Sequence, residues 1–196
     1  MTQQVQTPPL DSLTATAKTA AAKGPPPVHL WHPDYCGEID MRIASDGTWF
    51  YMGTPIGRPA LVKLFASILR KDPERYVLVT PVEMVGIKVD DAPFIAVAME
   101  REDHDFGQRL TFRTNVDDLT TISADHPMRF SFDARGGLTP YVHVRGDLWA
   151  KVSRPVFYDL VALGEERKVD SVVMFGIESN GAFFPMIEAS RLAEID

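Results

Sequence analysis

The sequence predicts an α+β protein built from two similar, β-rich lobes, and three observations support this prediction. Short alternating segments typical of strands dominate the chain from Val28 onward. Only two segments of this body have the apolar spacing of an amphipathic helix, one starting at Pro59 and the other at Pro155. Each helix begins with Arg-Pro, follows a predicted strand hairpin and leads into an apolar strand, so the two halves resemble each other.

Turn signals between the strands predict mainly antiparallel pairing. Residues 38–44 alternate between apolar and polar side chains, Asp46-Gly47 supplies a tight turn, and residues 48–52 return as an aromatic-rich strand. Two further hairpins are expected, 85–89 with 94–98 and 141–144 with 148–152, and two further strands, 109–114 and 128–132.

The two helices, expected over about residues 59–70 and 155–166, share the register of their apolar faces. A shift of 96 residues places Leu61 on Phe157 and Leu64 on Leu160. We interpret this as an internal duplication of a strand–strand–helix–strand unit. The alternative is that both helices merely use proline in the first turn, where it is generally favoured.

The chain is expected to divide into a flexible tail (1–27), an N-terminal lobe (28–104) and a C-terminal lobe (105–196). The tail has only Val5, Leu10 and Leu13 as larger aliphatic residues, too few to offset the entropy of ordering it. A docking peptide for a protein partner is the alternative. The charged run 100–105 is expected to be a solvated hairpin tip at the junction of the lobes.

Composition excludes several classes of function. The 20 Lys and Arg against 27 Asp and Glu give a net charge of −7, which disfavours nucleic acid and anionic membranes as partners. The longest apolar run, 94–99, is too short to span a bilayer, and no signal peptide is present, so a cytoplasmic protein is expected. One cysteine excludes an internal disulfide. No phosphate-loop, dinucleotide, nucleophile-elbow or zinc-protease motif occurs, so no cofactor is expected and a non-enzymatic role is favoured.

The most informative charges are Arg58 and Arg154, which precede the prolines at the two helix starts. A cation there faces the positive end of the helix dipole and cannot cap the free N–H groups. A bound anion such as phosphate would reverse that penalty, and Gly57 would allow close approach of the backbone. The alternative is a structural ion pair with a carboxylate of the other lobe.

An aromatic stretch and a cysteine–histidine cluster are the other candidates. Trp49 and Tyr51 share one face of their strand and are candidates for stacking on a base, unless they only close the β core. His29, His32, Asp34 and Cys36 are close in sequence, but their spacing fits no established zinc pattern, so no metal site is assigned. Cys36 with His32 or His29 remains the hydrolase alternative.

The segment Trp49-Phe50-Tyr51-Met52-Gly53-Thr54-Pro55-Ile56-Gly57-Arg58, continuing into 61–65, resembles the signature of a bacterial family, domain of unknown function 1285. Shorter matches lie at 76–83, 91–94, 112–115, 154–158 and 181–185, and together they cover most of the chain from 28 to 186. The resemblance implies a duplicated fold whose C-terminal domain is superficially pleckstrin-homology-like. It also implies a site between the domains for a nucleotide-like ligand and a role in signalling.

Taken together, the sequence predicts non-catalytic binding of a small anionic, nucleotide-like ligand between the lobes, reported to a protein partner. Arg58, Arg154 and Gly57 would hold the anion, while Trp49 and Tyr51 would supply stacking. Two alternatives remain: an interaction scaffold without ligand, and a hydrolase that uses Cys36.

Overall fold

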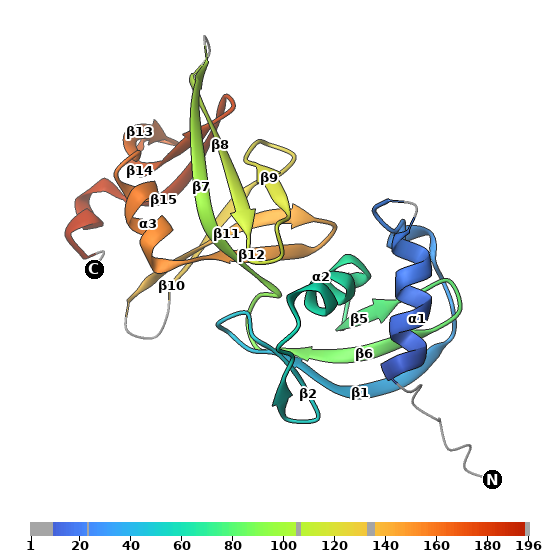
Figure 1. The fold of residues 1–196 in the computed structure, drawn as a ribbon. Helices are drawn as coiled ribbons and strands as arrows, with labels where there is room; N and C mark the ends of the chain where they lie inside the picture. Colours follow the sequence, from blue (N-terminus) through green and yellow to red (C-terminus); the bar gives the residue numbers. More distant parts are fainter. Residues whose placement is uncertain (1–9, 23, 105–106, 133–135, 195–196) are drawn as a thin grey trace. The chain divides into compact units, whose positions relative to one another are not determined.

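The computed structural model of the chain describes residues 10–22, 24–104, 107–132 and 136–194, which form an α+β protein (Figure 1). The chain divides into two compact units, in agreement with the two lobes predicted from the sequence. Unit 1 comprises Met1–Pro93 and Gly146–Leu148, and unit 2 comprises Phe94–Arg145 and Trp149–Asp196. None of the described helices is both long and apolar enough to cross a bilayer.

Unit 1 is built around one six-stranded sheet with the strand order β3-β2-β1-β6-β5-β4. Its elements are α1 (Leu10–Ala21), η1 (Val28–Leu30), β1 (Tyr35–Ile43), β2 (Trp49–Tyr51), β3 (Thr54–Pro55), α2 (Pro59–Ser67), β4 (Leu69–Asp72), β5 (Arg75–Val79) and β6 (Met84–Val89). All neighbouring strands are antiparallel except β1 and β6, which run parallel. The predicted hairpin over 38–52 is confirmed as β1 and β2.

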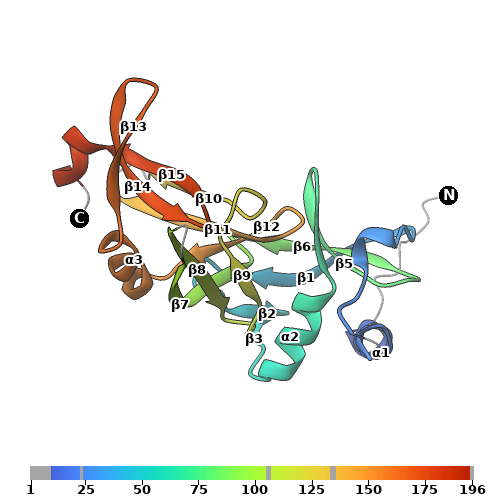
Figure 2. The same cartoon turned by 90° about the horizontal axis from the view of Figure 1, so that it is seen from above.

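The N-terminal residues 10–21 form a packed helix, not the flexible tail expected for 1–27. Helix α1 lies beside α2 in both views (Figures 1 and 2). Its Leu13 and Ala17, spaced one helical turn apart, are completely buried. The tail prediction counted large aliphatic residues, but one leucine and a small alanine suffice when they fit against an existing apolar helix. Residues 1–9 lie outside the described part.

Unit 2 contains two sheets, one of six strands and one of three. The six-stranded order is β10-β11-β12-β7-β8-β9, and the three-stranded order is β13-β14-β15. Their elements are β7 (Phe94–His104), β8 (Gly107–Thr114), β9 (Leu119–Thr121), β10 (Met128–Phe132), β11 (Leu138–Arg145), β12 (Leu148–Val152), α3 (Arg154–Val161), β13 (Glu165–Val169), β14 (Val172–Ser179), β15 (Ala182–Glu188) and η2 (Ala189–Glu194). Again one pair, β12 with β7, is parallel.

Strand β7 belongs wholly to unit 2, which corrects two expectations. The predicted hairpin of 85–89 with 94–98 does not form, because β6 and β7 lie in different sheets. The division between the units falls at Pro93/Phe94, not at 104/105. Residues 100–104 continue β7 and pair with β8 as far as His104 opposite Gly107, so the charged run is the end of a hairpin within unit 2.

The edge of β8 near its start is paired by side chains and backbone of the β14–β15 turn. The amide N–H of Gln108 donates to Glu178 Oε2 at 3.2 Å, and the amide N–H of Asn180 donates to the Gln108 carbonyl at 2.8 Å. The Leu110 N–H donates to Ser179 Oγ at 3.0 Å, and that hydroxyl donates to the Ile122 carbonyl at 2.9 Å. These bonds join the three-stranded sheet to the six-stranded one.

Replacing Leu13 by alanine is expected to destabilise unit 1 by about 2–5 kcal/mol, because it removes a fully buried side chain and leaves a cavity under α1. The exposed Lys18→Ala in the same helix should change stability by less than about 0.5 kcal/mol. Urea unfolding of the full chain measures both. Equal midpoints for Leu13→Ala and Lys18→Ala would show that α1 does not pack as described.

Gly176→Ala is expected to destabilise unit 2 by about 1–3 kcal/mol. Gly176 lies beside a bulge whose extra residue, Met186, is in β15. A Cβ at Gly176 would stand 2.4 Å from the Phe184 carbonyl oxygen and 2.9 Å from the Pro185 Cα, and backbone atoms cannot easily yield. The control is Gly57→Ala, since no heavy atom lies within 4 Å of its added methyl group. Thermal unfolding that ranks the two substitutions equally would contradict the bulge geometry.

Candidate functional site

Helix α3 begins at Arg154, directly after β12, and no side chain caps its first turn. Its N-cap residue Ser153 is extended (φ −66°, ψ 152°) and makes no side-chain capping hydrogen bond. Val156 and Phe157 are buried and hold the helix in unit 2. The positive end of the helix dipole at Arg154 is therefore available to an anion.

A pocket of about 220 Å³ lies beside this helix start. The start of β11, the end of β12 and one face of α3 line it with Gly137, Leu138, Thr139, Pro140, Lys151, Val152, Arg154, Phe157 and Tyr158. Sites for drug-sized molecules typically measure roughly 300–1,000 Å³. The pocket is therefore sized for a small molecule or a single chemical group rather than for a large cofactor.

Arg154 is held in this pocket by Tyr158, one helical turn later. Its Nε–H donates to Tyr158 Oη at 2.9 Å, and its guanidinium carbon lies 5.6 Å from the tyrosine ring centroid. Within the described residues, no carboxylate forms an ion pair with Arg154. Its terminal N–H groups and the Tyr158 hydroxyl supply donors for an anion, and Lys151 also lines the pocket.

Sequence reasoning named Arg154 but not its two neighbours in the pocket. The sequence could have indicated Tyr158, because it follows Arg154 by four residues and residues four apart on a helix lie on the same face. Lys151 lies only three residues before Arg154, but this closeness in sequence does not show that both residues line one pocket.

Arg58 is the N-cap residue of α2, in an extended conformation with φ −110° and ψ 100°. Arg58 is exposed and, like Arg154, forms no ion pair with a carboxylate of the described residues. The neighbouring Gly57 is also exposed, with no heavy atom within 4 Å of where a Cβ would stand. The space beside the Gly57 backbone is therefore open, and its role in holding an anion stays a prediction. Arg58 lies in unit 1 and Arg154 in unit 2, so a shared ligand stays a prediction.

The stacking role predicted for Trp49 is wrong. Trp49 is only 2% exposed, lies opposite Ile43 in the β1–β2 pair, and stacks on Phe65 with ring centroids 6.4 Å apart. The alternation of the strand places this ring on the core face, which is the alternative that the sequence left open. Tyr51 lies on the same face opposite Met41 and is half-buried.

Cys36 hydrogen-bonds to its own local backbone. Its Sγ–H donates to the Asp34 carbonyl at 3.5 Å, and no hydrogen bond joins it to His29 or His32 within the described residues. No group of three or more His, Cys, Asp or Glu that could hold a metal ion occurs among those residues either. The hydrolase alternative thus has no supporting contact.

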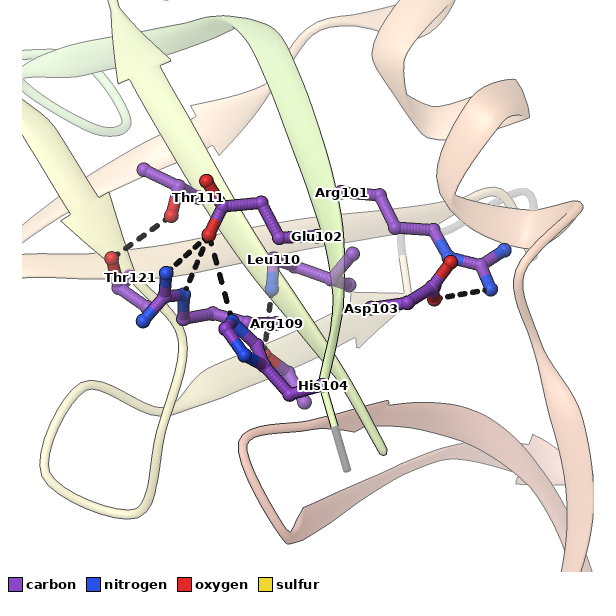
Figure 3. A network of polar contacts seen from close by, with 9 residues as sticks. Arg101, Glu102, Asp103, His104, Arg109, Leu110, Thr111 and Thr121 are labelled. Carbon is purple, nitrogen blue, oxygen red and sulfur yellow. Dashed lines mark hydrogen bonds and ion pairs between the residues drawn. The ribbon is translucent and has the colours of Figure 1, made fainter. Parts of the chain in front are cut away.

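The charged end of the β7–β8 hairpin is a network of surface ion pairs (Figure 3). Arg109 donates two hydrogen bonds to Glu102, and Arg101 pairs with Asp103 at 2.7 Å. The hydrogen bonds and positive charge of Arg109 hold the pKa of the Glu102 carboxyl below its ordinary value. Exposed pairs of this kind contribute little to stability, so the network mainly fixes the hairpin register.

A larger hollow of about 480 Å³ lies between this hairpin and the C-terminal end of α3. Its carboxylates already have partners: Asp103 pairs with Arg101, and Glu165 pairs with Arg167. Glu178 accepts hydrogen bonds from the backbone N–H groups of Gln108 and Gly181. With these charges internally compensated, the hollow is a poorer candidate than the pocket at Arg154.

Glu83 in unit 1 is an unusual buried carboxyl group. It is 8% exposed, and its Oε1 has no hydrogen-bond partner among the described residues. Burial raises the pKa of Glu83 above the ordinary value of 4.5, because desolvation disfavours the ionised form.

The two-unit α+β architecture places the chain among proteins with paired β-rich domains, and comparison with known families identifies it further. Residues 26–92 match the family description "Domain of unknown function (DUF1285), N-terminal domain", and residues 93–186 match "Protein of unknown function (DUF1285), C-terminal domain". The chain belongs to the DUF1285 family. The family boundary at 92/93 agrees with the division between the units within one residue.

Two solved structures of this family are similar to the chain. A DUF1285 family protein from Silicibacter pomeroyi DSS-3 is 50% identical over 92% of this chain and 97% of its own, with a TM-score of 0.84. One from Shewanella baltica OS155 is 31% identical over 63% of this chain and 91% of its own, with a TM-score of 0.52. No curated protein matches.

The raised pKa of Glu83 predicts a pH-dependent loss of stability. The folded protein keeps the Glu83 proton at pH values where the unfolded chain has already lost it, so the stabilisation is complete below about pH 4.5 and declines as the pH rises through the folded-state pKa. Glu83→Gln should lack this decline. Denaturant midpoints of both proteins from pH 4 to 7 should therefore diverge, with the variant gaining on wild type as pH rises. A constant difference would contradict the burial of the carboxyl group.

Proposed function

We propose that this protein binds a small anionic ligand without catalysis, in the pocket at the start of α3, and reports its presence to a protein partner in signalling. The observation that carries the proposal is Arg154. Its guanidinium lies beside the uncapped end of a helix, lines a pocket, and has a tyrosine hydroxyl rather than a carboxylate as its partner. An anion at this place would add a counter-charge and charge-assisted hydrogen bonds.

Charge and pocket size favour a phosphoryl group as the bound moiety. The chain as a whole carries a net charge of −7, so nonspecific anion binding is disfavoured and the local donors must act together. Arg154 supplies positive charge, and the Tyr158 hydroxyl supplies a neutral donor. A small phosphorylated metabolite or the phosphate end of a nucleotide satisfies this arrangement, while the rest of a larger ligand would extend outside the pocket.

A duplicated fold would explain why Arg58 stands at the equivalent helix start of unit 1. In both units a hairpin precedes the helix, and three antiparallel strands follow it, β4–β6 in one case and β13–β15 in the other. We propose that these are copies of one ancestral unit, that unit 2 is superficially pleckstrin-homology-like, and that Arg58 contributes to anion binding in the same way.

A thermal-shift screen of inorganic phosphate, nucleotides and phosphorylated metabolites tests this function. A ligand at about one hundred times its Kd adds about 2.7 kcal/mol of stability, which raises the Tm by roughly 5–10 °C. Arg154→Ala should weaken binding by at least about tenfold, since charge-assisted hydrogen bonds are worth about 1.5–3 kcal/mol. At an unchanged ligand concentration the shift would fall to about half.

Arg113→Ala is the matched control, because it removes one exposed positive charge of unit 2 that pairs with Asp117 away from the pocket. It should leave the ligand shift unchanged. An unchanged shift in Arg154→Ala would place the site elsewhere, and Arg58→Ala then decides whether unit 1 contributes. The absence of any shift across the screen would favour a scaffold without ligand.

A further inference from the structure

Two histidines of unit 2, distant in sequence, meet at their ring nitrogens. His126 precedes β10, and His143 lies in β11. The Nδ1 atoms of the two rings are 3.1 Å apart, with ring centroids 5.0 Å apart and planes inclined by 38°. Both residues are half-buried, so the pair is partly in contact with solvent.

The backbone on both sides holds the two rings in place. The His126 N–H donates to Ser123 Oγ, and the His126 carbonyl accepts from the Ser123 N–H at 3.1 Å. His143 donates its N–H to the Pro127 carbonyl at 3.0 Å, and its carbonyl accepts from Thr120 Oγ1 at 2.7 Å. The approach of the rings is thus set by the fold, not by flexible side chains alone.

The distance between the two Nδ1 atoms matches the distance between two nitrogen ligands of one transition-metal ion. With metal–nitrogen distances of about 2.0–2.1 Å, two ligand nitrogens stand about 2.9 Å apart at a right angle and about 3.3 Å apart at the tetrahedral angle. The observed 3.1 Å lies between these values. Imidazole nitrogens are favoured ligands of Zn²⁺, Ni²⁺ and Cu²⁺.

We propose that His126 and His143 form a two-imidazole binding site for a divalent transition-metal ion. In the metal-free pair of neutral rings, one hydrogen lies between the two Nδ1 atoms, so one ring donates and the other accepts. When a metal binds both Nδ1 atoms, the ring that donated this hydrogen carries it on Nε2 instead, and each ring stays neutral. Water or a ligand from outside completes the coordination, because no third protein ligand is present among the described residues.

The neighbouring aromatic ring provides a local reporter. Trp149 lies edge-on to His143, with ring centroids 5.2 Å apart, and the Arg129 guanidinium carbon lies 4.4 Å from the Trp149 centroid. Paramagnetic Cu²⁺ on His143 should therefore quench Trp149 fluorescence. The Arg129 charge opposes a dication, so Arg129→Gln should tighten binding.

The experiment titrates Cu²⁺ into the full, tag-free chain and follows tryptophan fluorescence and the electron paramagnetic resonance spectrum. We expect saturable quenching and a spectrum with two directly coordinated nitrogens. His126→Gln and His143→Gln should each weaken binding by at least tenfold, and Trp149→Phe should keep the binding but lose most of the quenching. The double variant His29→Gln/His32→Gln, which removes another histidine pair close in sequence, should bind as wild type does.

Three outcomes would overturn the proposal: no saturable binding, affinity unchanged in both His126→Gln and His143→Gln, or loss of binding only in the His29→Gln/His32→Gln control. If circular dichroism shows that either single variant is unfolded, the electron paramagnetic resonance spectrum of the wild-type chain still tests the proposal. Fewer than two coordinated nitrogens there would leave the pair a structural hydrogen bond only.

Discussion

In unit 2, the two sheets are joined because the backbone groups at the start of β8 have no neighbouring strand on one side and must find other partners. Main-chain N–H and C=O groups removed from water must find partners. Gln108 and Leu110 find theirs on Glu178, Ser179 and Asn180, which end one strand of the small sheet and begin its turn. This arrangement favours a glycine at 107, because the backbone there has φ +119° and a Cβ would stand 2.8 Å from the Glu178 carboxylate that accepts the Gln108 N–H.

The same accounting of polar groups separates structural charges from functional ones. At the β7–β8 hairpin, Glu102 pairs with Arg109 and Asp103 pairs with Arg101, and Glu178 accepts hydrogen bonds from backbone N–H groups, so these carboxylates have partners within the fold. Arg154 differs, because a neutral hydroxyl is its partner and an uncapped helix end is its neighbour. A cation that the fold leaves without a counter-charge, beside a pocket, is a better indicator of a ligand than a larger hollow with balanced charge.

The two helix starts show how one local pattern acquires different surroundings. Both carry Arg-Pro, and both lack a side-chain cap. At α3 the end of β12 and the start of β11 complete a pocket around the arginine. At α2 the residues before the helix are exposed, and the backbone at Gly57 is open. The likeness of the helices thus predicts related roles without requiring equal sites.

The sequence by itself determined the strand-rich α+β class, both helices of the body, and the hairpins around Asp46-Gly47 and Gly146-Asp147. These features depend on local periodicity and on turns that favour particular residues. It also indicated Arg58 and Arg154, because the chemistry of a helix start is local. The lining of the pocket by the start of β11 and the meeting of His126 with His143 depend instead on how the strands pair.

Only the tertiary structure decided which strands pair and which segments cover each apolar face. The β6 and β7 segments are strands as predicted, yet they enter different sheets, because alternation fixes which face is apolar but not which neighbour is paired. Trp49 is buried against Phe65 of α2, and Leu13 is buried in α1, the helix that packs on α2. Such surfaces exist only after distant segments have assembled, so residue counts in a local window could not reveal them.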